Sequence, residues 1–168
     1  MRQDNQREAY LYAYLAGIID GEGTIRIEKA NRIKTNWVPR YSAAICAVNT
    51  NQEVIELLRQ TFTPQCNMRK VEVLQSRKPC YRWGTSGSQI TQGILEKLLP
   101  FLVIKRSQAE LVLEFCRKKK SFANFKGGVS KEELLWREEF YQKVKKLNAT
   151  GAPATTNQEH TREGEVIV

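Results

Sequence analysis

The segment from Ala9 to Gly23 constrains the fold of this chain more than any other stretch. Small residues recur in it at every fourth position, at Ala9, Ala13, Gly17 and Gly21. In an α-helix this spacing places the small side chains in one stripe, with larger apolar residues on both flanks. A helix that is apolar nearly all round has to be buried nearly all round, and a stripe of small residues lets a second helix approach closely. We therefore expect this helix to pack against another helix along the stripe.

Two carboxylates framed by glycines follow at the end of this helix, in the order Asp20-Gly21-Glu22-Gly23. Glycine favours the end of a helix. A carboxylate there is able to cap a neighbouring helix N-terminus, whose backbone donors are unpaired, or to bind a hard cation such as Mg²⁺ together with phosphate oxygens. If two such helices paired about a two-fold axis, like charges would meet, which favours a metal. Both interpretations stay open on these residues alone.

The charge balance of the 168 residues indicates a polyanionic partner. The formal net charge is +9, and nucleic acid is the commonest partner of so basic a chain. An anionic membrane surface is the weaker alternative, because no basic amphipathic helix or lipidation motif is apparent. The apolar run before Asp20 is also well short of the roughly 20 residues that span a bilayer. We expect a nucleic acid partner and no membrane.

The cysteines and the histidine argue against a zinc site. Four cysteines lie far apart without a C-x-x-C pair, and the one histidine is His160. Reduced thiols without a signal peptide are typical of an intracellular protein, of a prokaryotic cytoplasm or an organelle. We expect residues 1–148 to form a single domain and residues 149–168, rich in Ala, Thr, Pro and Gly, to be a disordered tail.

Hydrophobic periodicity predicts an α+β fold. After the first helix, strand patterns cover residues 24–28, 37–48, 67–74 and 79–85, and helical patterns cover residues 88–99, 104–119 and 130–147. A further helix is expected between the two strand pairs. The order predicts a four-stranded antiparallel sheet with helices on one face. The other face must then meet water or a ligand.

Two capping boxes mark helix starts. Thr50-x-x-Glu53 opens the helix between the strand pairs, and Ser130-x-x-Glu133 opens the last one. We expect these helices and the one over residues 88–99 to bury the apolar positions at helical spacing. These positions are Val54, Leu57, Leu58 and Thr61, then Ile90, Ile94, Leu95 and Leu98, then Leu134, Phe140, Val144 and Leu147.

The outward positions of the predicted strands and their connections are mostly basic or polar. Long cationic side chains donate to guanine edges and phosphates, and a carboxylate is able to accept from cytosine. The alternative, that they only solvate the sheet face, stays open. The predicted DNA-binding residues are Arg26, Glu28, Arg32, Lys34, Arg40, Ser42, Arg69, Lys70, Arg77, Lys78 and Arg82.

Lys105 stands between an apolar run and the start of a predicted helix. A lysine there is able to stabilise charge at a scissile phosphate or to polarise a water molecule. An ordinary solvated lysine explains the same position, so the residue alone does not decide.

Residues 15–23, LAGIIDGEG, resemble the signature nonapeptide of the LAGLIDADG homing endonucleases. Residues 42–49 (SAAICAVN) resemble the second strand of that family, and residues 100–113 (PFLVIKRSQAELVL) resemble its proline-led helix with a lysine. The resemblance spans roughly residues 10–147 and is to the branch with one motif per chain. It implies the αββαββα homing-endonuclease fold, with the sheet forming a DNA-binding saddle.

The resemblance also implies roles for individual residues. Glu22, at the eighth motif position, would be the metal-binding acid, and Gly21 would offer its backbone carbonyl to the metal. Asp20 would be a packing and capping acid. Lys105 takes the place of the basic active-site residue, and Asn49 falls where several members carry a glutamine that orients water.

One motif per chain implies a homodimer that supplies two active-site acids. The resemblance therefore implies a site-specific, Mg²⁺-dependent double-strand DNA endonuclease with a near-palindromic target of about 20 base pairs. The alternatives are an RNA maturase acting on its host intron, or a relative that binds DNA without cutting; a structural protein that dimerises through the stripe is a third. The expected dimer interface comprises Ala13, Tyr14, Gly17, Ile18 and Gly21.

Overall fold

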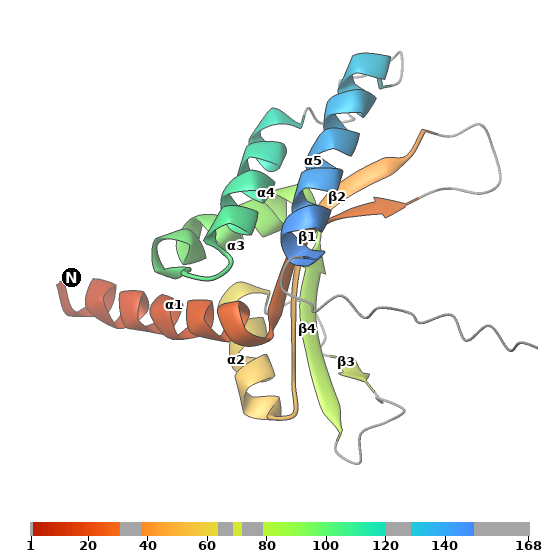
Figure 1. Cartoon of the computed structure of the whole chain (residues 1–168). Coiled ribbons are helices and arrows are strands. Elements are labelled where there is room, and N and C mark those ends of the chain that lie inside the picture. The colour runs from red at the N-terminus through yellow and green to blue at the C-terminus, as the bar shows by residue number, and fades with distance from the viewer. Residues whose placement is uncertain (1, 31–37, 64–68, 72–78, 120–128, 150–168) are drawn as a thin grey trace, which may run out of the picture.

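The computed structural model describes residues 2–30, 38–63, 69–71, 79–119 and 129–149. The chain alternates helices with strand pairs, as the sequence predicts (Figure 1). The predicted tail lies outside the described residues except for Ala149. The elements are α1 (Arg2–Glu22), β1 (Gly23–Ala30), β2 (Arg40–Asn49), α2 (Gln52–Phe62), β3 (Arg69–Val71), β4 (Cys80–Ser86), α3 (Ser88–Leu98), the 3₁₀ helix η1 (Leu99–Phe101), α4 (Arg106–Lys118) and α5 (Lys131–Ala149).

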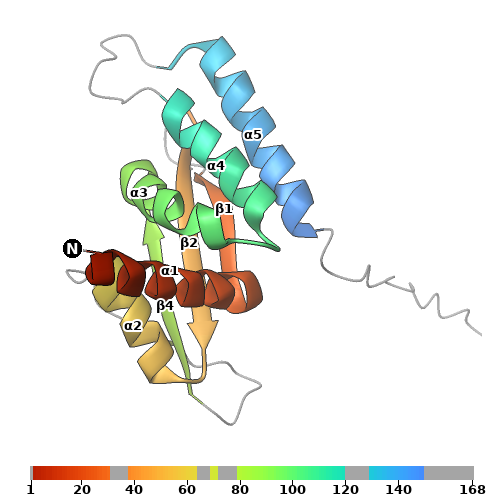
Figure 2. The ribbon, with the colours of Figure 1, turned by 90° about the vertical axis from the view of Figure 1, so that its left-hand side faces the viewer.

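The strands form one antiparallel sheet in the order β1-β2-β4-β3. Gly23 of β1 pairs with Ala47 of β2, and Trp83 of β4 pairs with the same Ala47. β3 contributes three residues at the edge beside β4. In Figure 2, α1, α3 and α4 cross in front of the strands, and α2 and α5 lie beside them. The predicted α+β class, an antiparallel sheet with helices on one face, is confirmed.

Alternation along β1 and β2 decides what faces the helices. Ile25 and Ile27 are buried against them, while Arg26 and Glu28 point to the uncovered face and are half-buried. On β2, the sequence predicts burial on one face only, but Ala44 on the opposite face is 1% exposed. Because β2 is an interior strand, the longer side chains of its neighbours cover a residue this small.

Only one face of α1 is buried in the single chain. Leu15, Ala16 and Ile19 are fully buried, whereas the stripe residues Ala13 and Gly17 are exposed. The expectation of burial nearly all round is therefore wrong for one chain. The sheet and α3 pack against the Leu15 face, which leaves the stripe open to solvent.

The start of α2 differs from the predicted capping box. The side chain of Asn51, not Thr50, accepts a hydrogen bond from the backbone N–H of Glu53 at 2.8 Å. The helix therefore begins one residue later than predicted. Leu58 is buried as predicted, and Ile55, which was not predicted, is buried too. The other predicted positions, Val54, Leu57 and Thr61, are half-buried.

The predicted start of α5 is confirmed. The Ser130 hydroxyl accepts a hydrogen bond from the Glu133 N–H at 3.1 Å. This helix buries Phe140 and Val144 as predicted, and it also buries an ion pair between Glu133 and Arg137. The predicted inward positions Leu134 and Leu147 are half-buried.

In α3 the predicted inward Ile90 is 45% exposed and Thr91 is buried instead. The Thr91 hydroxyl donates a hydrogen bond to the backbone oxygen of Ala43 in β2. This bond turns Thr91, and not Ile90, toward the sheet. Ile94, Leu95 and Leu98 are buried as predicted.

Gly23 joins α1 directly to β1. A Cβ at this position would lie 2.7 Å from the backbone oxygen of Ile19 and 2.8 Å from its Cα. Backbone atoms of a buried helix cannot move aside cheaply, so only glycine fits this helix-to-strand junction.

We therefore expect Gly23→Ala to lower the free energy of unfolding by roughly 1–3 kcal/mol, the usual cost of overpacking. Gly93→Ala in α3 is the matched control, because a Cβ there meets no atom within 4 Å. It should be neutral or stabilising by up to about 1 kcal/mol. Urea unfolding measures both, and equal midpoints for the Gly23 variant and the native chain would contradict the steric argument.

Candidate active site and nucleic-acid interface

Asp20 binds the turn that leads into α4, a segment distant in sequence. Its Oδ2 accepts hydrogen bonds from the backbone N–H of Val103 (2.8 Å) and Ile104 (3.2 Å), and its Oδ1 accepts one from the N–H of Lys105 (2.8 Å). Lys105 is the N-cap position of α4 and provides no capping acceptor of its own. The carboxylate is 8% exposed, and these donors compensate for its burial. Asp20 is thus a packing acid that fixes the turn before α4, whereas the predicted cap would bind the first-turn amides of the helix itself.

Lys105 is held at the same place through its side chain. Its ammonium donates a hydrogen bond to the backbone oxygen of Asp20. This carbonyl belongs to the last turn of α1, where a cation also interacts favourably with the helix dipole. The structure thus brings Lys105 to the end of α1 that carries the predicted metal-binding acid.

Gly21 and Glu22 form the solvent-exposed C-terminal end of α1. Both are exposed, and a Cβ at Gly21 would meet no atom within 4 Å. No group of three or more His, Cys, Asp or Glu side chains able to hold a metal occurs in the part of the chain that the structure describes. A carboxylate and a backbone carbonyl are hard oxygen donors that suit Mg²⁺, which retains several waters and phosphate oxygens as its remaining ligands. The residues present therefore fit such an ion.

Asn49 lies at the end of β2. Because Ala47 pairs with Gly23, Asn49 and Glu22 occupy the same end of the sheet. Its Oδ1 accepts a hydrogen bond from the N–H of Asn51 at 2.8 Å, in the turn that leads into α2. This bond holds the side-chain oxygen and leaves the amide NH₂ group as its donor.

The uncovered sheet face carries several of the predicted DNA-binding residues. By register, the even-numbered positions of β1, β2 and β4 share this face. Arg40 and Arg82 are exposed on it, and Arg26, Glu28 and Ser42 are half-buried. Arg69 and Lys70 lie in β3. Arg32, Lys34, Arg77 and Lys78 lie outside the described residues.

A polar network crosses this face and joins three strands. The Arg26 guanidinium donates to the Cys46 thiol sulfur at 2.9 Å and to the Glu28 carboxylate at 2.6 Å. The second carboxylate oxygen accepts from the Ser86 hydroxyl at 2.9 Å. Sequence reasoning missed Cys46 and Ser86, although the alternation of β2 and β4 places both on the face of Arg26.

No model of a protein family matches this sequence. DNA endonuclease I-CvuI of Chlorella vulgaris is 31% identical over 121 residues, which cover 70% of this chain and 71% of the relative. The chain belongs to the LAGLIDADG homing endonuclease family. As a LAGLIDADG homing endonuclease it is a DNA endonuclease, a hydrolase by reaction class.

Solved structures show the homing-endonuclease fold. I-CvuI in complex with its target matches with a TM-score of 0.68 at 23% identity, over 84% of this chain and 83% of that chain. I-TnaI matches with a TM-score of 0.59 at 14% identity, over 83% and 96%. The LAGLIDADG homing endonuclease I-GzeII matches with a TM-score of 0.54 at 15% identity, over 83% of this chain and 44% of that one.

Two exposed apolar residues near the site escaped the sequence analysis. Val103 is 81% exposed and Ile104 is 72% exposed, and their backbone amides contact Asp20 at the end of α1. The apolar run that contains them was visible in the sequence, but the exposure of these two side chains was not.

Among the described helices, none combines the length and hydropathy needed to cross a bilayer.

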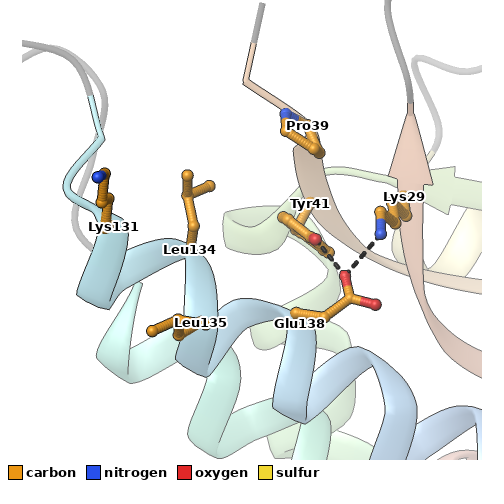
Figure 3. A pocket seen from close by; sticks show the side chains of 7 residues that line it. All are labelled: Lys29, Pro39, Tyr41, Lys131, Leu134, Leu135 and Glu138. Carbon is orange, nitrogen blue, oxygen red and sulfur yellow. Dashed lines mark hydrogen bonds and ion pairs between the residues drawn. The ribbon is translucent and has the colours of Figure 1, made fainter.

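A cavity of about 450 Å³ lies elsewhere, between α5 and the β1–β2 pair (Figure 3). Lys29 and Tyr41, which pair across β1 and β2, contribute to its wall. They stand six residues along the strand from Gly23, about 20 Å from the α1 end of the sheet. Their side chains both donate to the carboxylate of Glu138. This cavity is therefore separate from the candidate active site.

These donors give Glu138 a pH-dependent role in stability. Hydrogen bonds from Lys29, Tyr41 and Gln142 lower the pKa of Glu138 from its ordinary 4.5 to about 2. A carboxylate with a depressed pKa stabilises the fold above pH 4.5, and this contribution is lost as the pH falls from about 4.5 to about 2.

Glu138→Gln should therefore lower the urea midpoint at pH 7, and the gap to the native chain should narrow at pH 3. The exposed Glu132→Gln on the same helix controls for the loss of one negative charge. A gap of constant size between pH 7 and pH 3 would show that the carboxylate contacts contribute no pH-dependent stability.

Proposed function

We propose that this endonuclease acts as a homodimer that cleaves a near-palindromic double-stranded DNA target of about 20 base pairs with Mg²⁺. The observation that carries the proposal is the end of α1, where an exposed Glu22 and the anchored Lys105 adjoin an open stripe of small residues. One chain supplies one such acid, and two strands of a duplex need two. Host intron RNA is a further candidate partner, and we propose an intracellular location.

The open face of α1 supports the homodimer. Ala13 and Gly17 are exposed, and a Cβ at Gly17 would meet no atom within 4 Å. Tyr14 beside them is 50% exposed, Ile18 is half-buried, and Gly21 ends the stripe. Apolar exposure along a bare helix backbone is what a second copy of the same helix would cover, at close approach. The exposed Val103 and Ile104 extend this apolar area.

The chemistry proposed is hydrolysis of one phosphodiester on each strand. Glu22 and the Gly21 carbonyl would hold the ion, which would supply positive charge at the scissile phosphate while water displaces one ester oxygen of the phosphodiester as an alcohol. The Lys105 ammonium donates to a phosphate oxygen and stabilises the charge that develops there. Asn49 orients the attacking water through its amide group.

The uncovered sheet face forms the DNA-binding saddle in this proposal. Arg26, Arg40 and Arg82 are placed to reach base edges or phosphates, with Glu28 and Ser42 beside them. Each sheet follows about one helical turn of the major groove. Arg69 and Lys70 of β3 are further candidates for such contacts, and Arg32, Lys34, Arg77 and Lys78, which lie outside the described residues, stay candidates from the sequence.

Cleavage of DNA with and without Mg²⁺ tests the function. The native protein should cut a duplex selected from a randomised library, and EDTA should abolish cutting. Glu22→Gln should lower the cleavage rate at least about 100-fold, because it removes the carboxylate ligand. Binding of the same duplex in Ca²⁺ should stay close to native.

The matched control is Glu110→Gln, an exposed carboxylate on α4 paired with Arg106. It should cut like the native chain. Normal cutting by the Glu22 variant would refute the metal assignment. A native protein that binds DNA or intron RNA yet never cuts would favour the maturase or the non-cleaving relative.

The dimer has its own test. Gly17→Leu should convert the protein from dimer to monomer in sedimentation equilibrium, because the leucine would hold two α1 helices apart. The folded monomer should survive, since the side chain enters open space. Gly93→Leu, at another exposed helical glycine, should remain dimeric. A Gly17 variant that sediments as a dimer would place the interface elsewhere.

A further inference from the structure

We infer that Asp20 is a positioning residue for cleavage, acting through Lys105 rather than on DNA or metal. This inference rests on the proposed function, in which Lys105 contacts the scissile phosphate. Its basis is that one residue of α1 holds Lys105 at both ends. The Asp20 carboxylate binds the backbone N–H of Lys105 at 2.8 Å, and the Asp20 backbone oxygen accepts from the Lys105 ammonium.

A lysine side chain needs such an anchor. Its four-carbon stem adopts many rotamers, and its ammonium is a point charge without directional geometry. A cation that acts in a transition state contributes most when its position is set beforehand. The contact to the Asp20 carboxylate fixes the position of the Lys105 backbone, and the contact to the Asp20 backbone oxygen fixes the position of its ammonium group.

The anchoring residue is also the one next to the proposed metal ligands. Asp20 directly precedes Gly21 and lies two residues before Glu22 on the same helical turn. Lys105 is 85 residues away in sequence, at the start of α4. The Asp20 contacts therefore fix the lysine relative to the carboxylate of the same active site, and any shift of α4 against α1 would separate the two.

Capping alone explains less of this geometry. A cap needs one acceptor for one or two N–H groups of the first turn, as Ser130 provides for α5. Asp20 accepts from three consecutive amides, with 8% of its surface exposed. The added contact from the Lys105 ammonium is not part of a cap and ties the charged end to the helix tip.

A double-mutant cycle distinguishes positioning from capping. Asp20→Asn keeps the shape and the backbone oxygen that binds the Lys105 ammonium, but its NH₂ group opposes the bound amides on one side, so the backbone of Lys105 is no longer fixed against α1. We expect kcat to fall on the order of 10- to 100-fold with KM and Ca²⁺-dependent binding unchanged. In a Lys105→Met background the same change should lower the residual kcat by less than about threefold.

Two further variants guard the result against simple unfolding. Ser130→Ala removes the cap of α5 and should destabilise the protein without lowering kcat at a temperature where it is folded. Asp20→Glu keeps the charge but displaces the carboxylate, and it should lower kcat with KM unchanged if Asp20→Asn does not fold. If Asp20→Asn lowered kcat by the same factor in the native and the Lys105→Met backgrounds, the inference would be overturned. A folded Asp20→Asn variant with the kcat of the native protein would overturn it too.

Reductive methylation tests the anchor without catalysis. Peptide mass spectrometry should show Lys105 methylated more slowly than the exposed Lys145 in the native protein, and several-fold faster after Asp20→Asn. An unchanged rate would overturn the anchor. A native protein that does not cut DNA, yet shows this protection, would refute the proposed function while leaving the contact in place.

Discussion

The buried carboxylate of Asp20 is the interaction on which the rest of the molecule depends. A charge that is 8% exposed is tolerated only where donors surround it. Three backbone amides at the start of α4 provide them. This contact joins the end of the first helix to a turn more than 80 residues further along the chain. The contact holds Lys105, at the entry to α4, against the end of α1 that carries Glu22.

The two faces of α1 serve different purposes. Leu15, Ala16 and Ile19 belong to the core of the single chain, whereas Gly17 and Tyr14 on the opposite face remain exposed. If the small residues faced the core instead, the large apolar side chains on the other face would stay exposed to water. A glycine has no side chain that could contribute burial in their place. The stripe is therefore left for close approach by another helix, which the proposed homodimer uses.

In the proposed function, chemistry and recognition occupy separate regions of the molecule. Glu22 and Asn49 lie at the end where α1 enters β1, and the contacts among Arg26, Cys46, Glu28 and Ser86 spread over the uncovered face. The network links three strands, so the guanidinium of Arg26 is held in a defined orientation. A rigid, polar face beside a defined catalytic end suits an enzyme that selects its site before it cuts.

Local signals carried much of the fold. Alternation around Ile25 and Ile27, the Ser130 cap and the periodicity of α4 are properties of neighbouring residues, and each was correctly predicted. The α2 cap was wrong by one residue, because Thr50 and Asn51 are both good caps and only the geometry of the turn selects Asn51. Burial of Ala44 was missed because it depends on side chains from two other strands.

By itself, the sequence determined the elements, the antiparallel layout, the basic character and the acids at the end of the first helix, since these follow from short-range periodicity, turn residues and composition. The tertiary structure decided which face of α1 is buried and that Asp20 meets amides more than 80 residues away. It also decided that Lys105 reaches the carbonyl of Asp20. These depend on contacts between distant segments, whose partners no local pattern specifies.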